Sequence, residues 1–194
     1  MKPGGGKQKG AQFERDICRS LSLWISGNKN PNLLWRSAMS GGRSTLMRRA
    51  GNKNDEQAGD ISAVGEEGHL LVKKFYLECK HYADLGIDNF MLSRPSKLGK
   101  FWEIALKDAR SVGKVPLLIA KQNRYPEIVV STTEVFKHLF VKGRLRFVKI
   151  QTGLAGAEII VILLDDLISN FTLNTTTNMI INGEVPLRRS EDGN

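Results

Sequence analysis

Two stretches decide the fold and the chemistry of this chain: Gly59-Asp60-Ile61 and, further on, Phe75-Tyr76-Leu77-Glu78-Cys79-Lys80. If residues 75–82 form a β-strand, its side chains alternate between two faces, so Glu78 and Lys80 lie side by side on one of them. The strand is apolar enough to belong to a core, where a carboxylate and an ammonium are costly unless they are paired or bind a metal. The pattern therefore indicates a functional site.

The composition bounds the class of protein. With 194 residues, 41% of them hydrophobic and 25% charged, the chain is typical of one globular domain. Its net charge of +9 favours a polyanionic partner, most commonly nucleic acid, over a basic surface with no partner. Cys18 and Cys79 form no Cys-x-x-Cys motif, which fits a reducing cytoplasm, or a host cytoplasm for a phage protein. No apolar run approaches about 18 residues, so we expect no membrane span.

Local patterns predict a mixed α/β domain with one central sheet flanked by helices. Residues 1–10 are predicted to form a flexible basic arm, residues 11–171 a single domain, and residues 172–194 a polar extension with a disordered end. The predicted helices cover residues 11–25 and 98–112, and a capping box at 131–134 opens a shorter one to about 140. Strands are expected at 33–36, 60–64, 70–82, 115–120, 127–130, 146–150 and 158–164, with a hairpin turn at 65–68.

Glu14 interrupts the apolar face of the first predicted helix. At about 100° per residue it falls within the arc that holds Phe13, Ile17 and Leu21. One interpretation is a carboxylate at the edge of the stripe that reaches solvent. The other is a buried acid that points at the sheet and takes part in a site.

Several cations are candidate phosphate contacts. The segment 36–54 is long and carries no acid, and its cations favour phosphate contact over a merely solvated surface. The basic arm adds further lysines, whereas the two cations after the strand at 115–120 fit surface charges and phosphate contacts equally well. The candidate contacts are Lys7, Lys9, Arg36, Arg43, Arg48, Arg49, Lys121 and Arg124.

Hydrolysis of a phosphodiester needs an activated water and stabilised negative charge, which a hard divalent ion held by carboxylates supplies. Asp60 and Glu78, on neighbouring strands, can converge on one ion, and the backbone carbonyl of Cys79 can add a ligand. Lys80 can orient the water or neutralise charge, and Glu14 can complete the metal shell. The three histidines are scattered, which argues against a zinc site. We therefore expect Mg²⁺, with Mn²⁺ as a substitute.

The pattern Gly59-Asp60 … Glu78-Cys79-Lys80 resembles the core motif of PD-(D/E)XK nucleases, the restriction-endonuclease-like superfamily, with Gly59 in place of the usual proline. Within it, residues 9–16 resemble the first helix of archaeal-type Holliday junction resolvases, and residues 36–41 resemble their loop bearing arginine and serine. The resemblance implies a restriction-endonuclease-like core. It also implies catalytic Glu14, Asp60, Glu78 and Lys80, and a Ser40 that contacts phosphate.

These observations predict a metal-dependent, structure-selective DNA endonuclease. The leading hypothesis is resolution of branched DNA, the four-way Holliday junction, by paired nicks. Two symmetric nicks call for two active sites and hence a homodimer. Two alternatives stay open: a sequence-specific or repair-type endonuclease of the same fold, and a non-catalytic DNA-binding protein on the same scaffold.

Overall fold

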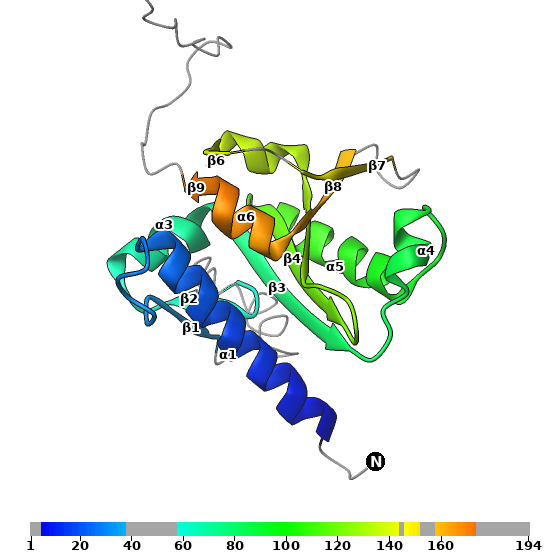
Figure 1. Cartoon of the computed structure of the whole chain (residues 1–194), viewed down its shortest axis with the longest axis horizontal. Helices are drawn as coiled ribbons and strands as arrows, with labels where there is room; N and C mark the ends of the chain where they lie inside the picture. Colours follow the sequence, from blue (N-terminus) through cyan, green and yellow to red (C-terminus); the bar gives the residue numbers. More distant parts are fainter. Residues whose placement is uncertain (1–4, 38–57, 144–145, 152–157, 174–194) are drawn as a thin grey trace, which may run out of the picture.

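The computed structural model describes residues 5–37, 58–143, 146–151 and 158–173 (Figure 1). As predicted, the chain is α/β, with a central five-stranded mixed sheet flanked by helices. The sheet runs, in spatial order, β3 (Phe75–Tyr82), β4 (Val115–Gln122), β5 (Ile128–Thr132), β8 (Glu158–Leu163) and β7 (Val148–Gln151). β3 and β4 are parallel, and the other neighbours are antiparallel.

Helices cover both faces of this sheet. The face toward the viewer in Figure 1 carries α1 (Gly5–Ile25) and α6 (Leu164–Asn170), and α3 (Glu66–Lys74) joins the same apolar cluster. The opposite face carries α4 (Ile87–Met91) and α5 (Lys97–Ser111). The remaining elements are two small antiparallel sheets and a 3-10 helix: β1 (Leu34–Arg36) with β2 (Ile61–Ala63), β6 (Leu139–Val141) with β9 (Phe171–Leu173), and η2 (Thr133–Lys137).

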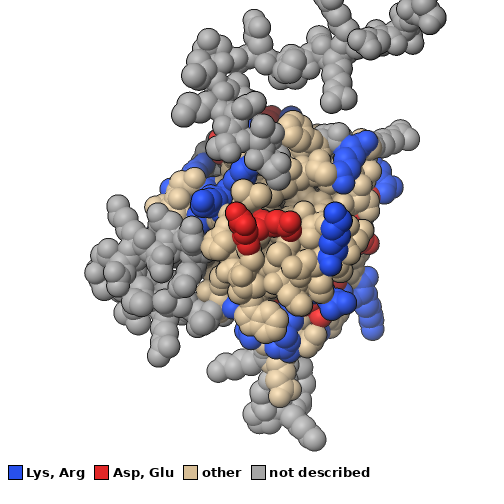
Figure 2. Space-filling view, turned by 90° about the vertical axis from the view of Figure 1, so that its left-hand side faces the viewer, with Lys and Arg blue, Asp and Glu red and all other residues tan. Residues whose placement is uncertain are grey.

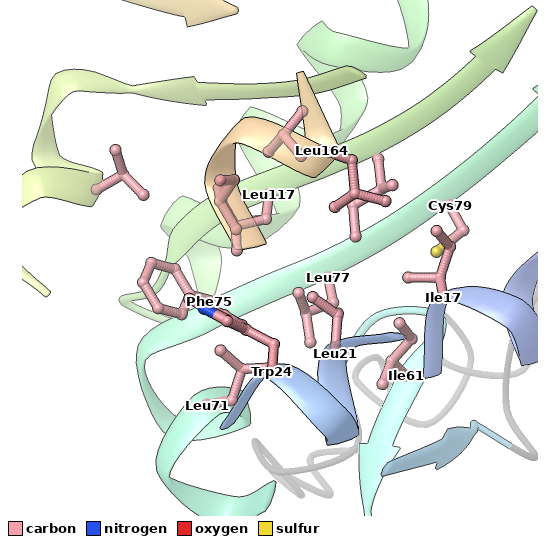
Figure 3. Close-up of a cluster of buried hydrophobic side chains, with 14 of the residues drawn as sticks. Ile17, Leu21, Trp24, Ile61, Leu71, Phe75, Leu77, Cys79, Leu117 and Leu164 are labelled. Atoms are coloured by element: carbon pink, nitrogen blue, oxygen red, sulfur yellow. The ribbon is translucent and has the colours of Figure 1, made fainter. Parts of the chain in front are cut away.

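The core on the α1 face is built from the apolar stripe of α1 and one face of β3. Figure 3 shows Leu21 and Trp24 directed at Phe75 and Leu77, which are all buried. The indole Nε1 of Trp24 also donates to the carbonyl of Phe171 at 2.9 Å. This packing fixes the helix against the strand that carries the predicted catalytic residues.

The second core lies between β3, β4 and α5. Leu98, Trp102 and Ala105 of α5 pack in the same apolar cluster as Tyr76 of β3. The helix starts where Ser96 accepts a hydrogen bond from the N–H of Gly99 at 3.0 Å, the usual N-cap arrangement. The predicted alternation of β3 is therefore confirmed, with odd-numbered residues facing α1 and Tyr76 facing α5.

One predicted hairpin is wrong. Residues 66–74 form α3 rather than a turn followed by a strand, and only residues 75–82 are extended. Glu66 and Glu67 stand at the positive end of the helix dipole and Lys73 and Lys74 at its negative end, which favours the helix. In place of a hairpin ladder, a single parallel bridge joins Gly59 to β3.

Other predicted boundaries also shift. α1 begins at Gly5, so residues 5–10 of the predicted flexible arm are helical. The capping box is not formed: η2 ends at Lys137, and the hydroxyl of Ser131 donates to the carbonyl of Pro116 at 2.7 Å. β9 continues past the predicted end of the domain at residue 171, and residues 174–194 lie outside the described ranges. No helix within the described ranges is long and apolar enough to span a membrane.

Candidate active site

The backbone at residues 59 and 60 brings the first motif to β3. Gly59 has φ of +102°, and a Cβ at this position would lie 2.5 Å from the carbonyl oxygen of Leu77. That close approach lets the N–H of Asp60 donate to the same carbonyl at 2.8 Å. On the other side, the N–H of Ser37 donates to the carbonyl of Asp60 at 2.8 Å. Asp60 is thus held between β3 and the end of β1.

The side chain of Asp60 reaches the second motif. Asp60 is 7% exposed, and its Oδ2 atom accepts a hydrogen bond from the backbone N–H of Cys79 at 2.9 Å. The same oxygen lies 3.4 Å from Nζ of Lys80. The structure therefore brings Asp60, Glu78 and Lys80 together, since Lys80 also forms an ion pair with Oε1 of Glu78.

The ammonium of Lys80 marks a point where oxygen ligands converge. Its Nζ contacts Oδ2 of Asp60, Oε1 of Glu78 and, at 3.2 Å, the carbonyl oxygen of Cys79. All three oxygens belong to residues that the sequence predicted as metal ligands, and hard divalent cations prefer such oxygens, whereas the fourth predicted ligand, Glu14, is not among the contacts of Lys80. Across the described ranges no group of three or more His, Cys, Asp or Glu residues is placed to hold a metal. The set around Lys80 differs from such a group because it has only two carboxylates, and its third oxygen is the backbone carbonyl of Cys79.

Burial and charge decide the protonation of the pair on β3. Burial raises the pKa of the Glu78 carboxyl and nearby Asp60 raises it further, while Lys80 and Tyr76 oppose the shift. Burial by itself lowers the pKa of Lys80, but the charges of Asp60 and Glu78 outweigh it and raise that pKa well above its ordinary value. Lys80 therefore stays charged, which suits an electrostatic role and not that of a general base.

Glu14 lies close by in a separate ion pair. Its side chain is 15% exposed, so it does not reach for solvent as the edge interpretation supposed. Its Oε2 atom accepts from Nε of Arg36 at 2.6 Å. Arg36, predicted as a phosphate contact, is thus already engaged with an acid. The catalytic role of Glu14 stays a prediction, because its carboxylate is not among the contacts of Lys80.

The two thiols are protonated and buried. Burial, followed by the charge of Glu14, raises the pKa of Cys18 to about 12. Burial and then Asp60 raise the pKa of Cys79 well above its ordinary value. A thiol nucleophile needs a lowered pKa, so the chemistry open to Cys79 is that of its backbone carbonyl.

The predicted DNA contacts are only partly described. Nζ of Lys9 donates to Oδ1 of Asn123 at 2.7 Å, which joins the start of α1 to the turn after β4. Lys121 is paired with Glu127, and Arg124 is exposed in that turn. The side chain of Lys7 and the residues Ser40, Arg43, Arg48 and Arg49 lie outside the described part of the structure. On the face drawn in Figure 2, the blue Lys and Arg side chains surround a small acidic group rather than forming one continuous basic surface.

Sequence reasoning assigned no part to three residues beside this site. The hydroxyl of Tyr76 lies 3.3 Å from Oε2 of Glu78 and 3.4 Å from Oδ2 of Asp108. Nζ of Lys80 lies 5.6 Å from the centre of the Phe101 ring. Tyr76 shares the strand face of Glu78, so alternation could have found it. Asp108 and Phe101 come from α5, and no local pattern relates them to β3.

Residues 5–178 match the family model described as "Phage putative PDDEXK endonuclease". No curated protein and no solved structure matches the chain.

Proposed function

Because the chain belongs to this phage PDDEXK endonuclease family, a family of nucleases, we propose that it is a metal-dependent, structure-selective DNA endonuclease that resolves four-way junctions by paired nicks. The observation that carries the metal-dependent part is the convergence of Asp60, Glu78 and the carbonyl of Cys79 on the ammonium of Lys80. A hard cation replacing or joining that ammonium would meet the oxygen donors it prefers.

In this proposal Asp60, Glu78 and the Cys79 carbonyl hold Mg²⁺, or Mn²⁺ in its place. A divalent ion held there would supply an activated water and positive charge for the phosphate. The chain fixes Asp60 through the N–H of Cys79. Lys80, which stays protonated, neutralises negative charge that develops on the phosphate during cleavage. Glu14, half-buried and paired with Arg36, supports the site from the α1 side.

The preference for junctions rests on resemblance and on symmetry. Residues 9–16 and 36–41 resemble the corresponding parts of archaeal-type Holliday junction resolvases. One chain supplies one set of Asp60, Glu78 and Lys80, whereas a junction is resolved by two nicks, so we propose a homodimer. The net charge of +9 supports binding to a polyanion.

A panel of labelled DNAs tests the activity and its substrate together. Linear duplex, single strand, flap and four-way junction of equal length are incubated with and without Mg²⁺, with D60N as the inactive control. We expect Mg²⁺-dependent, paired nicks in the junction and little cutting of the duplex. Competition between junction and duplex in Ca²⁺ measures binding preference, and sedimentation at micromolar concentration measures the oligomeric state.

Each of the other outcomes selects a different function. Equal or preferential cutting of linear duplex would point to a repair-type or sequence-specific endonuclease. Tight DNA binding without cleavage in Mg²⁺ or Mn²⁺ would point to a non-catalytic scaffold. A monomer that binds both DNAs equally would remove the resolvase proposal and leave the nuclease family standing.

A further inference from the structure

The hydroxyl of Tyr76 lies between two carboxylates that come from different elements. It is 3.3 Å from Oε2 of Glu78, two residues along β3, and 3.4 Å from Oδ2 of Asp108 on α5. Tyr76 is 4% exposed, so this hydroxyl meets its partners inside the protein and not in bulk water. A buried hydroxyl without a partner is costly, and these two contacts supply acceptors for its proton.

Both oxygens of Glu78 have a partner. Lys80 contacts Oε1, and the Tyr76 hydroxyl contacts Oε2. A glutamate side chain otherwise samples several rotamers, and two fixed partners restrict it to the orientation in which Oε1 faces Lys80. Oε1 is also the atom proposed to meet the ion. Tyr76 thus orients the Glu78 carboxylate through Oε2, the oxygen that Lys80 does not contact.

A phenol carries a single proton, so it donates to one of the two carboxylates at a time. When the proton is directed to Glu78, Oε2 is held. When the proton is directed to Asp108, Oε2 of Glu78 loses this hydrogen bond. Asp108 therefore competes with Glu78 for the hydroxyl, and the balance between them decides how firmly the Glu78 carboxylate is oriented.

We propose that Tyr76 is a positioning residue for Glu78, and that Asp108, as the competing acceptor of the same hydroxyl proton, sets how firmly Glu78 is held. The inference rests on the proposed function, because it assumes that Glu78 is a metal ligand. Partners that orient a ligand through its other polar atom affect metal affinity by about 10- to 100-fold in other sites. Neither residue is proposed to touch the substrate or the reacting atoms.

Mn²⁺ binding, followed by the loss of the free-ion signal in electron paramagnetic resonance, tests this without any cleavage. Y76F keeps the ring and removes the hydroxyl, and we expect it to bind Mn²⁺ about 10- to 100-fold more weakly than the parent. D108A removes the competing acceptor and leaves the phenol proton to Glu78, and we expect it to bind Mn²⁺ more tightly than the parent. Y82F is the matched control, because Tyr82 lies on the same strand face but stacks on Phe101 and makes no contact with Glu78.

The outcomes separate the inference from the function on which it rests. If the parent binds Mn²⁺ and Y76F binds it equally well, the positioning role is wrong while the metal site stands. If D108A binds Mn²⁺ no more tightly than the parent, Asp108 is not a competitor and the proposal fails in that part. If the parent itself binds no Mn²⁺, both the proposed metal site and this inference are overturned. Thermal unfolding of each variant confirms that the comparison is made on folded protein.

Discussion

The backbone N–H of Cys79 donates a hydrogen bond to Oδ2 of Asp60 at 2.9 Å, and this bond joins the two halves of the motif. Asp60 precedes β2, whereas Cys79 lies within β3 between Glu78 and Lys80. Since the donor is a backbone N–H within a paired strand, its orientation is fixed. The carboxylate of Asp60 is therefore oriented by the fold itself before it meets any other partner.

This bond separates the charge of Asp60 from its structural part. In D60N an amide oxygen can still accept from Cys79, so we expect the variant to fold like the parent and to lose Mg²⁺-dependent cleavage. In D60A the buried N–H loses its acceptor, which costs about 1–3 kcal/mol of stability. Cleavage assays and urea unfolding of the two variants measure both effects. A D60N protein that cuts at the parental rate would show that Asp60 is not a metal ligand.

Lys80 links the carboxylates of Asp60 and Glu78, whose side chains are 11% and 17% exposed. Removing it in K80A leaves two partly buried acids facing each other, and we expect a loss of stability on the order of 3 kcal/mol in metal-free buffer. A bound divalent ion supplies positive charge in its place, so added Ca²⁺ should restore part of the melting temperature.

Cleavage by K80A in Mg²⁺ should fall by about two to four orders of magnitude, the scale of a group that stabilises transition-state charge. Its affinity for DNA should change little, because Lys80 is engaged by carboxylates. K97A, which removes a lysine that lies over the Tyr82 ring, is the matched control. Weakened DNA binding with unchanged turnover in K80A would instead make Lys80 a phosphate contact.

Gly59 stands where the nuclease motif usually has proline, and the backbone explains why no proline fits. Its φ of +102° is far from the value of about −65° that the proline ring imposes. In G59A the added Cβ would meet the Leu77 carbonyl at 2.5 Å and displace Asp60 from β3. We expect G59A to be less stable than the parent by about 1–3 kcal/mol, the cost of a strained backbone. We also expect it to lose most of its cleavage activity. G113A is the control, since Gly113 also has positive φ but faces open space.

The sequence predicted the part of the site that follows from the side-chain alternation within one strand. The alternation of β3 predicted which residues share a face, and the structure places Glu78 with Lys80 as expected. α3 was missed because its centre, Leu70-Leu71-Val72, also suits a strand and Gly65 and Gly68 suggest a turn. A Cβ on Gly68 would lie 2.3 Å from the carbonyl oxygen of Leu33. That glycine therefore serves a close contact between α3 and a distant segment.

Contacts between separate elements left no local signal. Glu14 and Arg36 were each assigned to function, but their pairing depends on the packing of β1 against α1. Asp108 meets Tyr76 only because α5 covers the face of β3 opposite α1. The catalytic role of Glu14 remains a prediction, because its ion pair with Arg36 does not establish it.

His138 predicts how stability depends on pH. Its ring meets Phe75 edge-on at 5.6 Å, and burial lowers its pKa below 6.5, with Lys74 and Lys137 adding to the shift and Glu134 opposing it. Below pH 6.5 the unfolded chain binds a proton at this position that the folded chain resists. Stability should therefore fall as pH drops from about 6.5 toward the folded pKa. In H138Q this part of the fall disappears, which melting temperatures at pH 5 to 8 measure; an unchanged profile would assign the effect elsewhere.

The pair of Glu14 and Arg36 offers a way to tell a catalytic acid from a structural one. Oε2 of Glu14 lies 2.6 Å from Nε of Arg36, and the two side chains are 15% and 31% exposed, respectively. E14Q and R36Q both break the same ion pair. If the pair only braces α1 against β1, the two variants should lose similar stability and similar activity.

If Glu14 also supports the metal or its bound water, as the resemblance implies, E14Q should lose cleavage by at least ten times more than R36Q, a difference of about 1.4 kcal/mol in transition-state stabilisation. E14Q should also need more Mg²⁺ for half-maximal rate, whereas R36Q should not. Cleavage measured across a series of Mg²⁺ concentrations, beside unfolding curves for both proteins, separates the two cases. Equal losses in the two variants, with an unshifted Mg²⁺ requirement, would return Glu14 to a purely structural role and leave the site with Asp60, Glu78 and Lys80.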